Sequence, residues 1–119
     1  MHSQGAPLAL SIGDPSGIGA EIAIAAWQRR HEAGLPPFYL LVDPALVAAR
    51  ARLLSKEVPL AEVDPARAEA SFSDALPIVP IENRFVDAPG RPDKANAAGI
   101  VEAIERAVAD CFSGAAAAM

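Results

Sequence analysis

A glycine-rich stretch near the amino terminus has the residue types and spacing best suited to ligand chemistry. It reads Gly13-Asp14-Pro15-Ser16-Gly17-Ile18-Gly19, and it separates an apolar run at 8–12 from a helical pattern. A strand, a glycine-rich loop and a helix in this order place backbone N–H groups and the positive end of a helix beside a bound anion. The stretch is therefore a candidate ligand-facing loop.

The spacing of these glycines matches neither of the two standard phosphate-binding fingerprints. The Gly-Lys-Ser/Thr of a Walker A loop does not follow, and Ile22 stands where the third glycine of a Rossmann turn belongs. Asp43 lies at roughly the position of the ribose-binding acid in such a fold. On spacing alone, a tight strand-to-helix turn without a ligand explains the glycines equally well.

Few other side chains are candidates for catalysis or metal binding. His2 and His31 are far apart, and neither has a ligand-like spacing. Cys111 falls on an apolar stripe of a predicted helix, and Trp27 lies on a helix face, so both are interpreted as packing residues. The sequence therefore assigns no catalytic residue and no metal ligand.

Composition limits the class of protein. The 119 residues are 52% apolar but only 5% aromatic, which favours helices packed on a parallel sheet. The net charge of −5 and the lack of a basic run argue against nucleic-acid binding. A single cysteine and the lack of a long uncharged apolar run or a signal peptide predict a cytoplasmic protein without a membrane span.

Apolar runs of strand length alternate with helical patterns, which predicts an α/β fold with a mostly parallel sheet. Buried strands are expected at 8–12 and 38–42, and a short strand at 58–63. The run at 76–81 contains two prolines and is predicted to be an edge strand or an extended segment. A loop or single helical turn is expected at 64–74, and a connecting loop with a Pro89-Gly90 turn at 82–92.

Three longer helices are predicted, each with an apolar face directed inward. The first follows Ser16 or Asp14 as N-cap and runs to about His31; the second follows Asp43 and Pro44 and covers 45–55; the third follows Asp93 and covers 93–113. Glu102 and Arg106 are expected to pair on the outer face of the third helix. The predicted inward residues are Ile18, Ile22, Ala25 and Ala26; Leu46, Ala49 and Leu53, with Val47 and Leu54 as further candidates; and Ala97, Ile100, Val101, Ile104, Val108 and Cys111.

The carboxyl-terminal residues resemble the beginning of another buried strand. Gly114 follows the last helical pattern as a C-cap, and the apolar residues 115–119 follow it without a charge. The chain is therefore expected to be a portion of a larger protein.

Two motifs together resemble the 4-hydroxythreonine-4-phosphate dehydrogenase family. The first is Gly13-Asp14-Pro15-Ser16-Gly17-Ile18-Gly19-Ala20-Glu21, where the family usually has Gly-Asp-Pro-x-Gly-Ile-Gly-Pro-Glu. The second is Gly90-Arg91-Pro92-Asp93-Lys94-Ala95-Asn96-Ala97-Ala98-Gly99, which opens the last helix. The two motifs occur in the family's order, whereas residues 56–88 resemble nothing specific. Ala20 is a departure, because the family usually has proline there.

The resemblance implies a fold similar to isocitrate and isopropylmalate dehydrogenases and a homodimer of two-domain subunits, of which this chain is the N-terminal portion. It implies NAD-dependent oxidation of 4-phosphooxy-L-threonine to a β-keto acid that decarboxylates to 3-amino-2-oxopropyl phosphate, in pyridoxal phosphate (vitamin B6) biosynthesis. A divalent metal cation (Zn, Mg or Co) would assist, with its ligands outside these residues. The positions that match the motif and are implied to bind the cofactor are Asp14, Gly17, Ile18, Gly19 and Glu21.

Two alternatives remain open at the level of sequence. A paralogous dehydrogenase would act on threonate or erythronate 4-phosphate, or on an aromatic cis-dihydrodiol. A different class of protein, a non-catalytic α/β module, is expected to describe the 119 residues taken alone.

Overall fold

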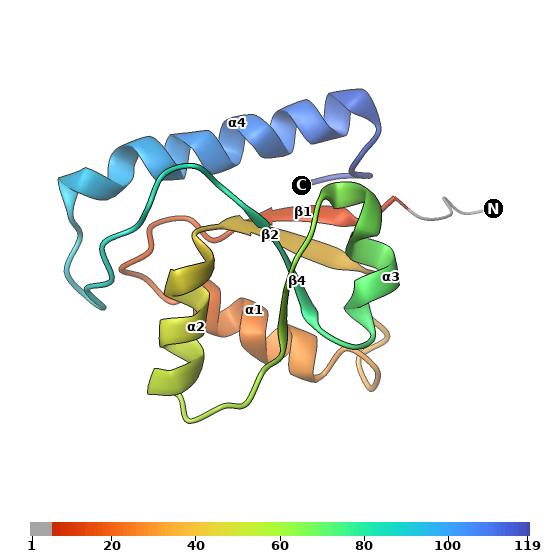
Figure 1. Ribbon diagram of the computed structural model, residues 1–119, viewed down its shortest axis with the longest axis horizontal. Helices are drawn as coiled ribbons and strands as arrows, with labels where there is room; N and C mark the ends of the chain where they lie inside the picture. The colour runs from red at the N-terminus through yellow and green to blue at the C-terminus, as the bar shows by residue number, and fades with distance from the viewer. Residues whose placement is uncertain (1–5) are drawn as a thin grey trace.

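The computed structural model describes residues 6–119, so His2 lies outside the described residues. The chain folds into one four-stranded sheet with helices on both faces (Figure 1). Within residues 6–119, none of the helices combines the length and apolar character that a membrane crossing requires. In chain order the elements are β1 (Leu8–Ser11), α1 (Gly19–Gln28), β2 (Phe38–Val42), α2 (Pro44–Leu53), β3 (Leu60–Glu62), a 3-10 turn (Pro65–Arg67), α3 (Ala68–Phe72), β4 (Leu76–Pro80), a second 3-10 turn (Lys94–Asn96) and α4 (Ala97–Ser113).

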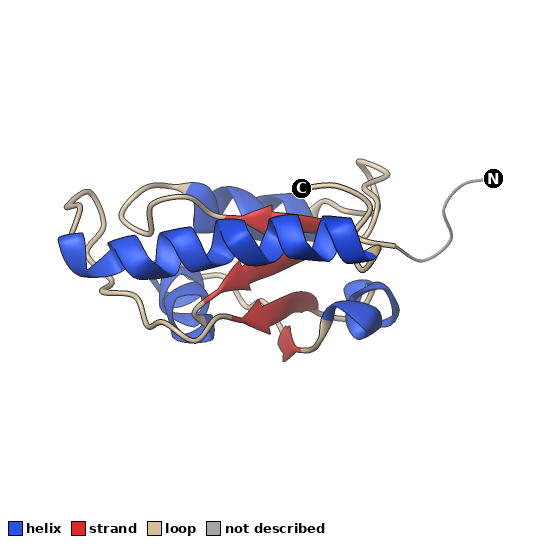
Figure 2. Cartoon of the chain, turned by 90° about the horizontal axis from the view of Figure 1, so that it is seen from above, coloured by secondary structure: helices blue, strands red, loops and turns tan. Residues whose placement is uncertain are grey.

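The sheet is parallel throughout and has the order β1-β2-β4-β3. Side chains of β2 alternate between its faces: Leu40 packs with α1 and α2, whereas Tyr39 and Leu41 pack with α4. Figures 1 and 2 show α4 along one side of the sheet and α1 and α2 on the other. This confirms the predicted α/β class, with both faces of the sheet buried.

Strand β4 corrects the prediction that the proline-containing run would lie at an edge. It is an interior strand between β2 and β3. Leu76 N and Ile78 O bond toward β3, whereas Ile81 N bonds to Val42 O of β2, so alternate residues face opposite neighbours. By this alternation, the backbone of Pro77 faces β2, at a position before the first pair between β2 and β4. The backbone of Pro80 faces β3, at a position after the last pair between β3 and β4. Neither proline therefore removes a hydrogen bond from the ladder.

Helix α1 begins later than predicted and buries a different face. Its first residue is Gly19, and Ser16 does not cap it, because Ser16 N and Oγ both bond to Asp14 Oδ1. Ile18 and Ile22 are 63% and 58% exposed. The helix is apolar on several sides, so periodicity could not select the correct stripe. The buried stripe is Ala20, Ala23, Ile24 and Trp27.

Helix α2 begins as predicted, with Pro44 in its first turn and Asp43 Oδ1 accepting from Ala45 N at 3.1 Å. Its inward face matches the prediction at Leu46 and Val47, which are buried, but differs elsewhere: Leu53 is 66% exposed, Leu54 is exposed and Ala49 is only partly buried. The buried residues are Leu46, Val47, Arg50 and Ala51.

Helix α4 also rests on the sheet by a different face from the one predicted. Gly99, Ala103 and Ala107 are buried, whereas Ala97, Val101, Ile104 and Val108 are exposed and Ile100 and Cys111 are partly buried. Small side chains allow a closer approach of the helix backbone to the sheet than large ones would. The Glu102–Arg106 pair forms at 3.5 Å, but it lies beside the end of β4 rather than fully in solvent: Arg106 Nη1 donates to Pro80 O at 2.8 Å.

The residues after α4 return to the sheet beside β1. Ala117 N donates to Pro7 O at 2.8 Å, and Ala9 N donates to Ala118 O at 2.9 Å. These bonds form a parallel bridge between Leu8 and Ala118. The predicted extended segment therefore pairs with the outer edge of β1, where Figure 1 places the C-terminus.

Candidate functional site

Three connections meet at the carboxyl edge of the sheet, because all four strands are parallel. They are the β1–α1 loop (residues 12–18), the short link through Asp43, and the β4–α4 loop (residues 81–93). Strands β2 and β4 are neighbours, yet the chain leaves β2 toward α2 on one face and β4 toward α4 on the other. Ligands of open α/β sheets bind outside the carboxyl ends of strands at such a divergence.

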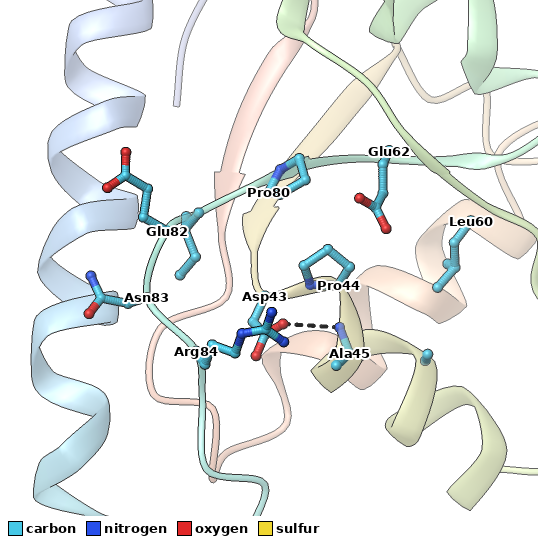
Figure 3. A pocket seen from close by; sticks show the side chains of 11 residues that line it. Asp43, Pro44, Ala45, Leu60, Glu62, Pro80, Glu82, Asn83 and Arg84 are labelled. Atoms are coloured by element: carbon cyan, nitrogen blue, oxygen red, sulfur yellow. Dashed lines mark hydrogen bonds between the residues drawn. The ribbon is translucent and has the colours of Figure 1, made fainter.

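A hollow of about 470 Å³ lies between the ends of β2, β3 and β4. Figure 3 shows the Arg84 side chain beside Asp43 and Ala45, with Glu62 on the opposite side. Glu62 and Arg84 are exposed. Asp43 Oδ1 caps α2 and its Oδ2 accepts from Phe85 N at 2.9 Å, so both oxygens are already used. Asp43 is therefore a structural residue rather than a free acid for a ribose. The lining residues are Asp43, Pro44, Ala45, Ala48, Leu60, Glu62, Pro80, Ile81, Glu82, Asn83 and Arg84.

The β1–α1 loop is a compact turn built on Asp14. Gly17 N donates to Asp14 O at 2.9 Å, and Ser16 N and Oγ donate to Asp14 Oδ1 at 2.9 and 2.8 Å. The N–H of Ser16, and then its hydroxyl, hold the pKa of Asp14 below its ordinary value. Gly13, with φ of +73°, makes the reversal that starts the turn.

Gly19 allows α1 to begin directly against the end of β1. A Cβ at this position would lie 2.1 Å from Ile12 O, which no side chain can tolerate. A Cβ at Gly17 would find its nearest neighbour, Asp14 O, at 3.4 Å. Of these two glycines, only Gly19 is therefore required by close packing.

The amino terminus of α1 supplies free hydrogen-bond donors. The cap residue is Ile18, and no side chain within residues 6–119 caps the helix. The N–H groups of Ile18, Gly19, Ala20 and Glu21 likewise have no acceptor in this part of the chain. Unpaired N–H groups at the positive end of a helix dipole attract anions. The loop can therefore bind a phosphate or carboxylate group.

Arg50 is a buried residue at this edge of the sheet that no sequence motif singles out. Its side chain is only 1% exposed, and every guanidinium nitrogen has a partner. Nη2 donates to Pro15 O at 2.5 Å and Nη1 to Gly17 O at 3.0 Å. Nη1 also pairs with Glu21 Oε1 at 2.7 Å, and Nε with Asp87 Oδ1 at 3.0 Å. The available sequence signal was a cation four residues after Leu46 on the inward stripe of α2.

The β4–α4 loop is held by side chains that accept from its N–H groups. Glu102 accepts from Glu82 N at 2.7 Å and from Asn83 N at 3.0 Å, and Asn96 Oδ1 accepts from Val86 N at 2.7 Å. Burial raises the pKa of Glu102, but these N–H groups, the Asn83 amide and Arg106 outweigh it, so the pKa lies below its ordinary value.

The two sequence motifs touch each other. Gly90, in the predicted turn with φ of +77°, donates from its N–H to Ser16 O at 2.8 Å. Asp14, Gly17, Ile18 and Gly19 lie in or next to the β1–α1 loop, and Glu21 joins them through Arg50. The structure therefore brings the predicted cofactor residues into one unit with the second motif.

No group of three or more potential metal ligands comes together within the described residues 6–119. His31 is exposed just after α1, and Cys111 is a partly buried thiol on α4. The carboxylates of Glu21 and Asp87 are both paired with Arg50. These residues do not fit a divalent metal site.

A parallel sheet with an uncapped, glycine-rich helix start at its carboxyl edge defines an α/β protein. The 4-hydroxythreonine-4-phosphate dehydrogenase of Methylorubrum extorquens is 51% identical over the whole of this chain, and that of Bradyrhizobium diazoefficiens is 45% identical over 95% of it. By sequence the chain belongs to the 4-hydroxythreonine-4-phosphate dehydrogenase family. It spans about 35% of the length of these relatives. No protein-family model matches the sequence.

Solved structures show the same fold at low sequence identity. A 4-hydroxythreonine-4-phosphate dehydrogenase from Burkholderia phymatum superposes with a TM-score of 0.82 at 16% identity, over 96% of this chain and 35% of its own. A terephthalate 1,2-cis-dihydrodiol dehydrogenase from Burkholderia xenovorans gives 0.69 at 23% identity, over 95% of this chain and 32% of its own. The fold of this chain therefore corresponds to about a third of a subunit with the isocitrate/isopropylmalate dehydrogenase-like architecture.

Proposed function

We propose that this chain is the amino-terminal portion of a two-domain, NAD-dependent dehydrogenase that oxidises 4-phosphooxy-L-threonine in pyridoxal phosphate biosynthesis. The observation that carries the proposal is the 51% identity to a 4-hydroxythreonine-4-phosphate dehydrogenase over the whole chain. At this identity a shared fold is certain, and a shared reaction is the simplest explanation of the two motifs that meet at Gly90 and Ser16. The expected product is a β-keto acid that loses carbon dioxide.

In this proposal, the β1–α1 loop faces NAD. Its candidate residues are Asp14, Gly17, Ile18, Gly19 and Glu21. The unpaired N–H groups of Ile18 and Gly19 suit an anionic pyrophosphate, and a glycine at 17 lets a ligand approach the backbone. NAD, when bound, supplies the hydride acceptor. The chain's own contribution is to bind and orient it.

The divalent metal of the proposed reaction is assigned to residues outside this chain. The acids Glu21 and Asp87 are engaged by Arg50, and Asp43 by two backbone N–H groups. No step of the reaction is therefore attributed to a metal held by these residues. The proposed active unit is a cytoplasmic homodimer of complete subunits, which light scattering of the intact protein would test.

The test is NADH formation by the intact subunit that carries this chain, followed by its absorbance. We expect turnover of 4-phosphooxy-L-threonine with NAD and a divalent cation, and loss of turnover when the cation is chelated. Turnover of threonate 4-phosphate, with none of 4-phosphooxy-L-threonine, would refute the substrate assignment. The intact mass of the natural protein tests the two-domain proposal separately, since two domains require far more than 119 residues.

A second candidate is a dehydrogenase for an aromatic cis-dihydrodiol. Its basis is the shared fold with the terephthalate 1,2-cis-dihydrodiol dehydrogenase, at a TM-score of 0.69. A fold can carry different substrates, so this likeness does not choose between them. The same NADH assay with a dihydrodiol separates the two candidates.

A further inference from the structure

We propose that Arg50 is a positioning residue of the β1–α1 loop, which turns the carbonyl oxygens of Pro15 and Gly17 inward and the N–H of Ile18 outward toward an anionic ligand. The ligand part of this inference rests on the proposed function; the part about loop geometry does not.

Arg50 donates hydrogen bonds to the backbone of the β1–α1 loop. Two of its four partners are the carbonyl oxygens of Pro15 and Gly17, at 2.5 and 3.0 Å. In a trans peptide the C=O and the following N–H point in opposite directions, and residues 6–119 contain no cis peptide. Fixing Gly17 O against Arg50 therefore directs the N–H of Ile18 away from it. That N–H has no acceptor among the described residues.

Two carboxylates hold the guanidinium in place. Glu21 Oε1 lies 2.7 Å from Nη1 on the α1 side, and Asp87 Oδ1 lies 3.0 Å from Nε in the β4–α4 loop. Both carboxylate side chains are about one-third exposed, at 30% and 34%, whereas Arg50 is 1% exposed. A buried cation with every nitrogen bonded has little freedom to move. Arg50 thus holds the β1–α1 loop, helix α1 and the β4–α4 loop together.

The planar fork of arginine is what this arrangement needs. Its donors point in fixed, divergent directions, and four acceptors from three segments surround them. A lysine ammonium would keep the positive charge but present its donors from one atom. Arg50→Lys therefore removes the geometry while retaining the charge. Arg52, exposed on the same helix, gives the matched control Arg52→Lys.

The test measures backbone motion and amide exchange by NMR on the intact subunit that carries this chain. In Arg50→Lys we expect the order parameters of Ile18 and Gly19 to fall, and the amides of Gly17 and Gly90 to exchange about tenfold faster, since each loses support for one hydrogen bond. Amides of the sheet, such as that of Ile81, should keep their wild-type rates, as should all amides in Arg52→Lys. Unchanged loop amides, or a uniform acceleration that includes the sheet, would overturn the positioning role.

A second variant, Asp87→Asn, tests the same role of Arg50 if Arg50→Lys does not fold. Asp87→Asn removes one charged arm and leaves Arg50 and both loop carbonyls in place. We expect faster exchange at Gly90 with unchanged sheet amides, and an unchanged Gly90 amide would overturn the clamp.

Titration with NAD separates this inference from the proposed function. If the wild-type protein binds NAD, Arg50→Lys should weaken the affinity about tenfold while Arg52→Lys does not; equal affinity overturns the ligand part. If the wild type does not bind NAD, the cofactor assignment fails, and the order parameters still decide the geometry.

Discussion

The two long loops at the carboxyl edge are anchored with opposite polarity. In the β1–α1 loop a buried cation, Arg50, binds carbonyl oxygens. In the β4–α4 loop the anchors Asp43, Asn96 and Glu102 accept from backbone N–H groups. The first loop bonds Ser16 N and Gly17 N to Asp14 but leaves the N–H of Ile18 without an acceptor among the described residues, whereas the second uses the N–H groups of Glu82, Asn83, Phe85 and Val86 internally. An anion is attracted to the first loop and gains little from the second.

The two loops also differ in what packs against their glycines. The β1–α1 loop packs backbone against backbone at Gly19, where a Cβ would lie 2.1 Å from Ile12 O. The β4–α4 loop packs a side chain against Gly99, where a Cβ would lie 2.5 Å from Phe85 Cε1. A phenylalanine ring can shift more readily than a strand backbone. The first loop should therefore tolerate substitution less well.

Gly19→Ala is expected to have the largest effect. The new methyl group would force the start of α1 away from β1, and overpacking of this kind costs about 3 kcal/mol of the free energy of unfolding. Chemical denaturation monitored by circular dichroism gives this value. Gly17→Ala is the matched control, because its Cβ has ordinary clearance, and it should cost less than about 1 kcal/mol. Equal losses in the two variants would contradict the close-packing account.

Asn96→Ala tests the anchoring of the second loop. Asn96 is 1% exposed, accepts from Val86 N at 2.7 Å and donates to Val86 O at 3.1 Å. Its removal leaves both backbone groups without their partner and should cost about 2 kcal/mol in denaturant unfolding. The exposed neighbour in Lys94→Ala should be neutral. The order parameters of Ile18 and Gly19 should not change, since a different residue holds their loop.

Glu102→Gln tests the charge on α4 that holds the same loop, and it should have the smallest effect at neutral pH, about 1 kcal/mol. The folded-state pKa of Glu102 is lowered from 4.5, so its carboxylate stabilises the fold above the unfolded pKa. That stability is lost as the pH falls below 4.5 through the folded-state pKa. Denaturation across this range should show the variant and the wild type converging. Glu105→Gln, exposed on the same helix, should follow the wild type at every pH. A gap that stays constant with pH would contradict the role of the charge.

Much of the fold could be predicted from the sequence, because strand runs and caps are local signals. The runs at 8–12 and 38–42 became β1 and β2, and Asp43 with Pro44 marked the start of α2. Helix faces could not be predicted, because α1 and α4 carry apolar residues on more than one side. Val101 is 52% exposed while Ala103 is buried, a choice made by how closely α4 approaches the sheet.

The candidate site was predictable only in part, for a related reason. The glycines of the β1–α1 loop are contiguous and visible, and their family resemblance pointed to the correct relatives. Arg50 lies 33 residues along the sequence from Gly17, whose carbonyl oxygen it binds. Its role depends on how α2 packs beside α1, which no local pattern encodes. Long-range polar anchors of this kind need the tertiary structure.

The most direct test of the account is an NMR titration, with NAD, of the isotopically labelled intact subunit that carries this chain, with each backbone amide followed separately. The account predicts that NAD shifts the amides of Ile18, Gly19 and Ala20, whose N–H groups have no acceptor among the described residues, and leaves Phe85 and Val86 unchanged. Shifts confined to the β4–α4 loop, or no shift at the start of α1 at saturating NAD, would contradict it.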